Sequence, residues 1–230
     1  MQINGAKLLG VKLVAGGVVT SGLTMSLDAN NSASYPGSGS TWFDVSGNNA
    51  DIALTGSPSF SSGTPAYFTF NGTNQYGIGS TTGVLSPSSY SKSVWFYLNA
   101  YNDNNLSSSS AGGHFIFMAS TNKIYCGHTD WPVYTAYPST QSFSLGTWYY
   151  LALTFDTTVG MTLYVNGVQD STYTDNKAPF SGNGSTNIAT FTGAGNFLSG
   201  RISKAFFYNR RLTAGEVLQN YNSTKSVFGL

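Results

Sequence analysis

WYYLALTFDTTVGMTLYVNGVQD, residues 148–170, is the stretch that decides the fold. Residues 148–155 are apolar at both odd and even positions, which is typical of a central strand buried on both faces. Residues 161–165 and 168–170 flank Asn166-Gly167, the strongest two-residue signal for a β-hairpin. This pair is predicted to form a type I′ turn with positive φ at both residues. The stretch therefore predicts three consecutive antiparallel strands.

Short strand signals of the same kind recur along the rest of the chain. They are rich in β-branched and aromatic residues, and Gly, Asn and Ser separate them. The predicted strands cover residues 23–27, 66–71, 93–100, 114–119, 123–128, 187–191 and 201–208. Two long polar stretches, 30–49 and 102–113, are expected to be loops. The pattern predicts an all-β fold, a two-sheet antiparallel jelly-roll sandwich.

One short helix is expected near the C-terminus. Thr213 and Glu216 have the spacing of a capping box, in which the two side chains satisfy each other's backbone N–H groups. Val217, Leu218 and Tyr221 then follow at spacings that place them on one helix face. The helix is predicted over residues 214–222, against the sandwich. This capping role accounts for Glu216, the single glutamate of the chain.

Composition excludes several classes of protein. Charged residues make up 8% of the chain and the net charge is +1, so the basic surface that nucleic-acid binding needs is absent. Cys126 is the single cysteine, and no internal disulfide is expected. The longest uncharged apolar run near the N-terminus, residues 13–19, is too short to cross a membrane. We expect one domain over residues 23–230, preceded by an arm or edge strand over residues 1–22.

Several motifs carry a resemblance to a known family. They are Leu27-Asp28-Ala29, Ser34-Tyr35-Pro36-Gly37-Ser38-Gly39, Phe70-Asn71-Gly72, Thr147-Trp148-Tyr149, Leu163-Tyr164-Val165-Asn166-Gly167 and Gly200-Arg201-Ile202. Together they resemble the laminin-G-like, concanavalin A-like lectin/glucanase superfamily. The Ser34–Gly39 segment is similar to members found in virions of tailed phages, especially phages of marine bacteria. The resemblance implies a concanavalin A-like sandwich, and it leaves the activity open because the superfamily includes binding, catalytic and structural domains.

Two departures from the family pattern concern calcium. Where calcium-binding relatives have aspartate before a tyrosine, this chain has Gln75, and where they have aspartate after Gly-x-Ile it has Ser203. Calcium sites need several oxygen ligands with carboxylates among them. We therefore expect no bound metal and no cofactor.

Catalytic signals are also missing. The glucanase branch of the superfamily uses two glutamates, and Glu216 is alone and assigned to the capping box. No two aspartates lie two apart on a predicted strand, and there is no Gly-x-Ser-x-Gly motif. His114, Cys126 and His128 are the other metal-ligand or nucleophile candidates, and they are interpreted as core residues. The sequence predicts that the protein is not an enzyme.

The segment 128–138 is the candidate ligand site. Its two prolines argue against a regular central strand, so Asp130, Trp131, Tyr134 and Tyr137 are expected on a loop. There, aromatic rings could stack on a sugar and the carboxylate could accept hydrogen bonds from hydroxyl groups. The alternative interpretation is a loop that packs on the sandwich or contacts another subunit.

The leading functional hypothesis is a structural phage protein that decorates or cements the capsid, or a tail or fibre, without catalysis. Its expected location is the virion, with synthesis in the host cytoplasm. The expected partners are other virion proteins and further copies of itself. Apolar residues of the arm, Leu8, Leu9, Val11, Leu13 and Val14, are the candidate anchor. The alternative hypothesis is an adhesin that binds glycans of the host surface.

Overall fold

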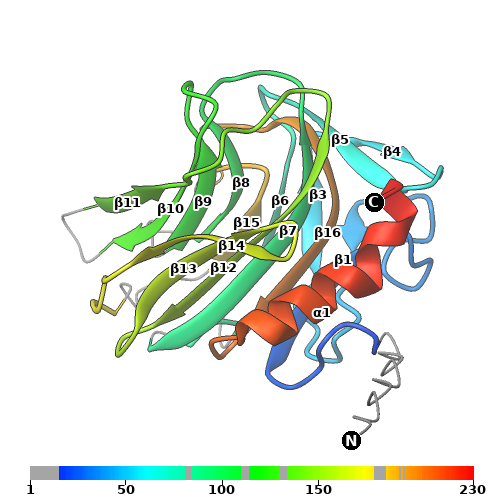
Figure 1. The fold of residues 1–230 in the computed structure, drawn as a ribbon. Coiled ribbons are helices and arrows are strands. Elements are labelled where there is room, and N and C mark those ends of the chain that lie inside the picture. The colour runs from blue at the N-terminus through cyan, green and yellow to red at the C-terminus, as the bar shows by residue number, and fades with distance from the viewer. Residues whose placement is uncertain are drawn as a thin grey trace, which may run out of the picture.

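The computed structural model describes residues 16–80, 84–86, 88–109, 114–129, 134–178, 185–191, 193 and 195–230. Two eight-stranded antiparallel sheets lie face to face, and one helix packs beside them (Figure 1). The chain is therefore an all-β sandwich with a short C-terminal helix, as the sequence predicts.

We name the first sheet sheet A. Its order is β14 (Val168–Tyr173), β13 (Gly160–Val165), β12 (Trp148–Asp156), β7 (Ser89–Leu98), β16 (Ser199–Tyr208), β5 (Tyr67–Asn71) and β4 (Ser59–Ser61), with β1 (Leu23–Asp28) also paired to β16. The expected central strand, β12, lies between β7 and β13. Asn166 and Gly167, between β13 and β14, have φ of 50° and 80°. The predicted hairpin is thus confirmed.

We name the second sheet sheet B. Its order is β11 (Tyr134–Pro138), β10 (Ile124–Thr129), β9 (His114–Met118), β8 (Asn104–Ser109), β15 (Ser185–Ile188), β6 (Tyr76–Ser80), β3 (Ile52–Thr55) and β2 (Thr41–Trp42). The main core lies between the two sheets and is built from large, fully buried side chains of both, including Trp42, Phe68, Phe96, Met118, Ile124, Phe155 and Phe207. Burial of this apolar surface is the main stabilising contribution to the fold.

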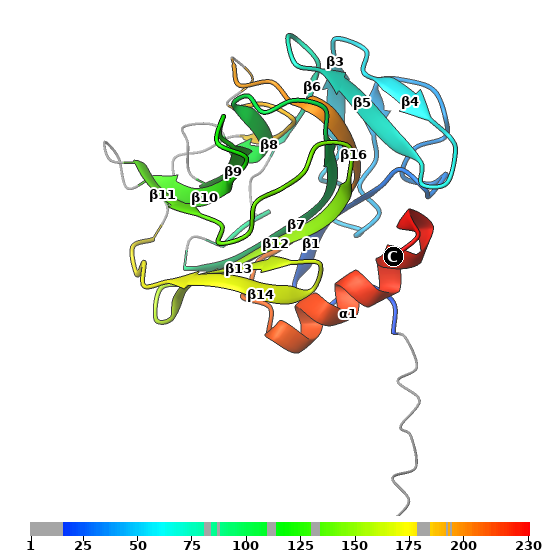
Figure 2. The ribbon, with the colours of Figure 1, turned by 45° about the horizontal axis from the view of Figure 1, so that its top comes forward.

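A second apolar cluster lies on the outer side of sheet A, beneath the helix α1 (Ala214–Thr224) and the 3₁₀ turn η2 (Lys225–Phe228). Figure 2 shows the helix against this side of the sandwich. The capping box of Thr213 and Glu216 is present, and Val217 is fully buried. Leu218 differs from the expectation, since it is 43% exposed; the other buried helix residues are Asn220 and Thr224.

Two polar stretches expected to be loops contain strands. β8 lies within 102–113, and its six residues are all buried, although five of them are polar. Hydrogen bonds compensate this burial: Ser108 donates to the carbonyl of Thr190, and Asn104 donates to the carbonyl of Ala100. The expectation was wrong because it equated polar side chains with exposure. Within 30–49, the short strand β2 pairs with β3.

Residues 134–138 also form a strand rather than the expected loop. β11 pairs with β10 along its whole length and lies at the edge of sheet B. Proline is compatible with an edge strand, because one side of such a strand needs no ladder donors. Pro138 ends the strand, and its carbonyl accepts a hydrogen bond from the Tyr173 hydroxyl.

The described part of the N-terminal arm is bound to its own sandwich. Val19 is buried; its N–H donates to Asn220 Oδ1 (2.8 Å) and its carbonyl accepts from the Tyr208 hydroxyl (3.0 Å). Gln219 donates to the carbonyl of Gly17. The candidate anchor residues Leu8, Leu9, Val11, Leu13 and Val14 lie outside the described residues. Among the described helices, none is long and apolar enough to cross a membrane.

Candidate functional site

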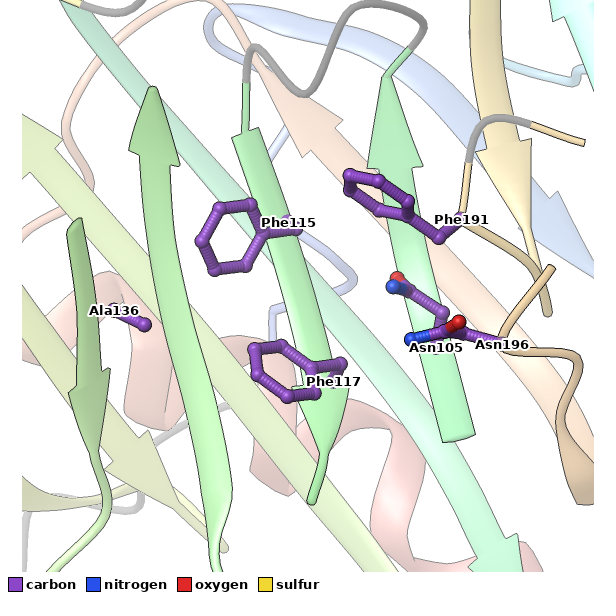
Figure 3. Close-up of a pocket in the computed structure, with 6 residues that line it drawn as sticks. All are labelled: Asn105, Phe115, Phe117, Ala136, Phe191 and Asn196. Carbon is purple, nitrogen blue, oxygen red and sulfur yellow. The ribbon is translucent and has the colours of Figure 1, made fainter. Parts of the chain in front are cut away.

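An open pocket of about 350 Å³ lies on the outer face of sheet B (Figure 3). Three phenylalanine rings and two asparagine amides line most of it. The lining residues are Asn105, Phe115, Phe117, Ala136, Phe191 and Asn196. They come from β8, β9 and β11 and from the segment between β15 and β16, so residues far apart in sequence meet at one surface.

Alternation along β9 separates pocket residues from core residues. His114, Ile116 and Met118 point between the sheets, while Phe115 and Phe117 point outward into the pocket. The outward side of a strand in a soluble sandwich is normally polar. Packing in the main core therefore does not explain two phenylalanines at these positions. Contact with the apolar surface of a ligand would explain them.

The phenylalanines belong to a row of aromatic rings that runs across the sheet. The Phe115 and Phe117 rings are 5.6 Å apart, and Phe191 meets Phe115 edge-on at 6.5 Å. On the other side, Tyr125 stacks on Phe117 at 5.5 Å. Phe115 is almost fully buried and Phe117 is half-buried. Phe115 thus forms the floor of the pocket, and Phe117 presents a ring to a ligand.

Small residues create the hollow beside this row. Phe115, Gly127 and Ala136 are directly opposite one another on β9, β10 and β11. Neither Gly127 nor Ala136 has a side chain large enough to fill the space next to the phenylalanine. The depression is therefore a consequence of the sequence of the two outer strands.

The two asparagines supply the polar part of the pocket. Asn105 lies next to a bulge in the β8–β9 pairing, and its backbone N–H donates to the carbonyl of Asn196 (3.0 Å). With its amide nitrogen turned toward the sheet, Asn105 donates to the carbonyls of Ser107 (3.1 Å) and Ile116 (3.2 Å). In this orientation its Oδ1 remains as an acceptor for a ligand hydroxyl. Asn196 is exposed at the rim.

The four candidate ligand residues from the sequence are placed as follows. Asp130 and Trp131 lie outside the described residues, in the connection between β10 and β11. Tyr134 begins β11, where its backbone pairs with Thr129. Tyr137 stacks on Tyr173 at 4.4 Å and packs against the core between the sheets. Ala136, on the same strand, lines the pocket.

The sequence analysis did not identify the pocket residues. Residues 114–118, His-Phe-Ile-Phe-Met, are apolar on both faces, and the same pattern describes a strand buried on both sides. The one available signal was the repetition of phenylalanine at every second position. This repetition could indicate an aromatic surface only once the other face of the strand, with Ile116 and Met118, was known to lie in the core.

A buried polar network lies behind the pocket floor. His114 and His128 are directly opposite each other and point between the sheets, as does Cys126. The Lys92 ammonium bonds to His114 Nδ1 (3.1 Å), and His128 Nε2 lies 3.3 Å from an Asp175 carboxylate oxygen. In the described part of the chain, no three His, Cys, Asp or Glu side chains group as metal ligands do.

Burial is the main cause of the pKa shifts in this network. It lowers the pKa of Lys92 to about 7 and holds the pKa of His114 well below its usual value, with the neighbouring Lys92 adding to the latter effect. Burial also raises the pKa of the Cys126 thiol. His114 and Cys126 are thereby kept in their neutral forms near neutral pH, and Lys92 loses its charge as the pH rises through about 7.

The two positions that depart from the family's calcium ligands both make hydrogen bonds within the protein. Ser203 is fully buried; its hydroxyl donates to the carbonyl of Ala66 (2.6 Å) and accepts from Asn30 (3.1 Å). Gln75 donates to the carbonyls of Gly56 and Ser57. Each side chain therefore has a local structural role.

Glu216 likewise uses its carboxylate in hydrogen bonds within the protein. It forms a bidentate pair with Arg210, at 2.6 and 3.0 Å, and it accepts from the backbone N–H of Thr213. The hydrogen bond from Arg210 is the main reason that the pKa of Glu216 falls to about 2. A carboxylate held ionised in this way cannot act as a general acid near neutral pH.

A family profile described as the concanavalin A-like lectin/glucanases superfamily matches residues 70–218, more than half of the chain. No curated protein matches the sequence. Among solved structures, the binding domain of Paraclostridial Mosquitocidal Protein 1 is similar, with a TM-score of 0.71, 17% identity and coverage of 88% of this chain and 52% of that one.

The receptor-binding domain of botulinum neurotoxin type G is also similar, with a TM-score of 0.68, 16% identity and coverage of 88% and 51%. Trypanosoma rangeli sialidase, solved with the inhibitor DANA, has a TM-score of 0.69, 17% identity and coverage of 91% and 34%. The chain thus spans about half or less of the length of these structures. At such identities, the similarity establishes the fold alone.

Proposed function

We propose that this chain, which belongs to the concanavalin A-like lectin/glucanases superfamily, is a non-catalytic module that binds carbohydrate in the aromatic pocket of sheet B. The observation that carries the proposal is the outward pair Phe115 and Phe117 beside the amides of Asn105 and Asn196 (Figure 3). Binding sites of this kind combine apolar surface with a few polar groups that fix orientation.

The pocket chemistry suits a sugar ring. The C–H side of a pyranose is apolar and would lie on the exposed ring of Phe117. Its hydroxyls would then donate hydrogen bonds to the Oδ1 of Asn105. They would also bond to the Asn196 amide, which has both an acceptor and a donor group. The volume of about 350 Å³ has room for one or two sugar residues.

The described pocket residues do not offer the groups that hydrolysis of a glycosidic bond needs. Glycosidases use two carboxyl groups on either side of the scissile bond. None of the described pocket-lining residues is acidic, and Glu216 is engaged with Arg210 at the helix start. The similar solved structures include a receptor-binding domain, a domain named only as a binding domain, and a sialidase, and the composition of the pocket favours the binding role here.

A glycan array with matched variants tests this function. Phe117→Ala removes the ring offered to the sugar, and Phe43→Ala removes a phenylalanine that is 41% exposed and does not line the pocket. We expect wild type and F43A to bind the same neutral glycans and F117A to lose them. A wild-type protein that binds no glycan, or an F117A variant that binds as wild type does, would contradict the proposal.

A second candidate function is display on a phage particle, as a capsid, tail or fibre decoration in contact with other virion proteins and with copies of itself. The observation that favours it is the resemblance of the Ser34–Gly39 segment to virion members of the family, together with the apolar sequence of residues 8–14. We propose this segment as the anchor. The function is compatible with glycan binding, since a displayed module can bind a host surface.

The anchor is tested by a chain that begins at Gly16. This truncation keeps Gly17 and Val19, which bond to the helix, and removes residues 1–15. The truncated protein should unfold cooperatively at the wild-type temperature and should fail to associate with particles or with itself. Normal association of the truncated protein would exclude the anchor.

A further inference from the structure

A second group of aromatic residues lies on the outer face of sheet A, beyond the end of the helix. Trp148, Tyr97, Arg201 and Thr69 are direct neighbours across β12, β7, β16 and β5. All four are half-buried, and they alternate with fully buried residues that face the main core. Phe228 borders the group, with its ring 5.0 Å from Trp148.

The guanidinium of Arg201 lies between two aromatic faces. Its central carbon is 4.4 Å from the centre of the Tyr97 ring and 4.7 Å from the centre of the Tyr67 ring. Trp148 contacts both tyrosines, with ring centres 5.6 Å apart in each pair. Stacking of this kind fixes the plane of the guanidinium and reduces the conformational freedom that a surface arginine normally has.

The other arginines of the chain have hydrogen-bond partners, and Arg201 differs from them. Arg210 pairs with Glu216, and Arg211 donates to the carbonyl of Gly160 and to the hydroxyl of Thr162. No described residue accepts a hydrogen bond from Arg201, and its Nε is buried without a partner. A fixed cation is therefore held at the surface with its outer N–H groups available.

We propose that Arg201, Tyr67, Tyr97 and Trp148 form a second binding site, for the carboxylate of an acidic sugar such as a uronic or sialic acid. A carboxylate matches the two terminal nitrogens of a guanidinium in a bidentate pair. The half-buried rings beside it offer an apolar surface for the pyranose. This ring surface is the reason for preferring an acidic sugar to a carboxylate alone. The site lies on the sheet opposite to the aromatic pocket and does not depend on it.

The experiment is a titration of ¹⁵N-labelled protein with sodium glucuronate, glucose and sodium acetate, followed at the indole N–H of Trp148 by NMR. Glucose lacks the carboxylate and acetate lacks the ring. Arg201→Gln removes the cation, and Lys225→Gln is the matched control, because it removes one positive charge from the nearby end of α1. F117A serves as the control for the pocket of sheet B.

We expect glucuronate to shift the Trp148 resonance in wild type, K225Q and F117A, and R201Q to weaken this binding about tenfold or more. Glucose and acetate should bind at least about tenfold more weakly than glucuronate. The proposal is overturned if wild type shows no shift at about 50 mM glucuronate, if R201Q titrates like wild type, or if acetate or glucose binds as well as glucuronate. Loss of the shift in F117A would mean that the resonance reports the other pocket, and it would also overturn the proposal.

Discussion

The ring of Phe115 lies across Gly127, the residue opposite it on the neighbouring strand. A Cβ at position 127 would come within 3.0 Å of Phe115 Cζ and within 1.9 Å of the carbonyl oxygen of Thr135. The floor of the aromatic pocket and the packing of the edge strand β11 against β10 therefore both require a residue without a side chain at position 127.

Replacing Gly127 with alanine should destabilise the protein and disturb the pocket. Backbone of β11 would have to move, and overpacking of this kind costs about 1–3 kcal/mol. Denaturant unfolding of G127A measures the loss. Gly17→Ala is the control, because a Cβ there meets no atom within 4 Å. Equal stability of the two variants would mean that β11 adjusts without cost.

The hairpin turn gives a second prediction. Gly167 has φ of 80°, a region that a β-branched residue rarely adopts, and a Cβ there would lie 2.9 Å from Tyr221 and 3.0 Å from Leu218. Gly167→Val should therefore lower the free energy of unfolding by about 2 kcal/mol or more, through backbone strain and displacement of the helix. Asn166→Gly keeps the turn but removes the hydrogen bond from the N–H of Tyr150 to Asn166 Oδ1 (3.0 Å), so it should cost about 1 kcal/mol, less than G167V. A wild-type melting curve for G167V would refute this account of the turn.

Stability should rise with pH across the neutral range. The folded protein holds Lys92 with a pKa of about 7, against 10.5 in an exposed lysine, so between these values the unfolded chain binds more protons. His114, with its pKa below 6.5, acts in the same direction at lower pH. Cys126, with its pKa raised above 9.0, opposes the trend above about pH 9. The gain from pH 7 to pH 9 should be roughly 1–3 kcal/mol.

Urea unfolding at several pH values between about 5 and 9 measures this slope. The groups that face the Lys92 ammonium are the Ser107 hydroxyl, the His114 ring and carbonyl and the Phe207 ring. Lys92→Met replaces the ammonium with an apolar group of similar length and should flatten the dependence above pH 7. If wild type and K92M show the same slope, Lys92 is not the group responsible.

Calcium should have no effect on the folded protein. Ser203 and Gln75 use their polar atoms in hydrogen bonds to backbone carbonyls, and neither supplies a carboxylate. A chelator should therefore leave the melting temperature unchanged. A drop of several degrees on chelation, reversed by added calcium, would show that other ligands hold the ion.

The sequence predicted most of the fold where local signals were strong. The capping box of Thr213 and Glu216 located the helix, and Asn166-Gly167 located the hairpin. The strand β8 was missed because its serines and asparagines are buried through hydrogen bonds to distant segments, such as that of Ser108 to Thr190. Such partners are known only when the chain is folded.

The candidate site was harder to predict than the fold. The pocket joins Asn105, Phe115 and Ala136 from three strands with Phe191 and Asn196 from a later segment, and no sequence spacing relates them. The sequence pointed instead to residues 128–138, and among the described side chains of that segment Ala136 lines the pocket. The prolines argue against a regular central strand, from which we expected a loop, but Pro138 ends β11, a strand at the edge of its sheet.

The central claim is that a sugar binds against Phe117 on the outer face of sheet B. A crystal structure of the protein with the strongest neutral glycan from the array tests it most directly. The account predicts a pyranose stacked on the Phe117 ring, with hydroxyls in hydrogen-bond distance of Asn105 Oδ1 and the Asn196 amide. A glycan bound elsewhere on the molecule, with the pocket empty, would contradict it.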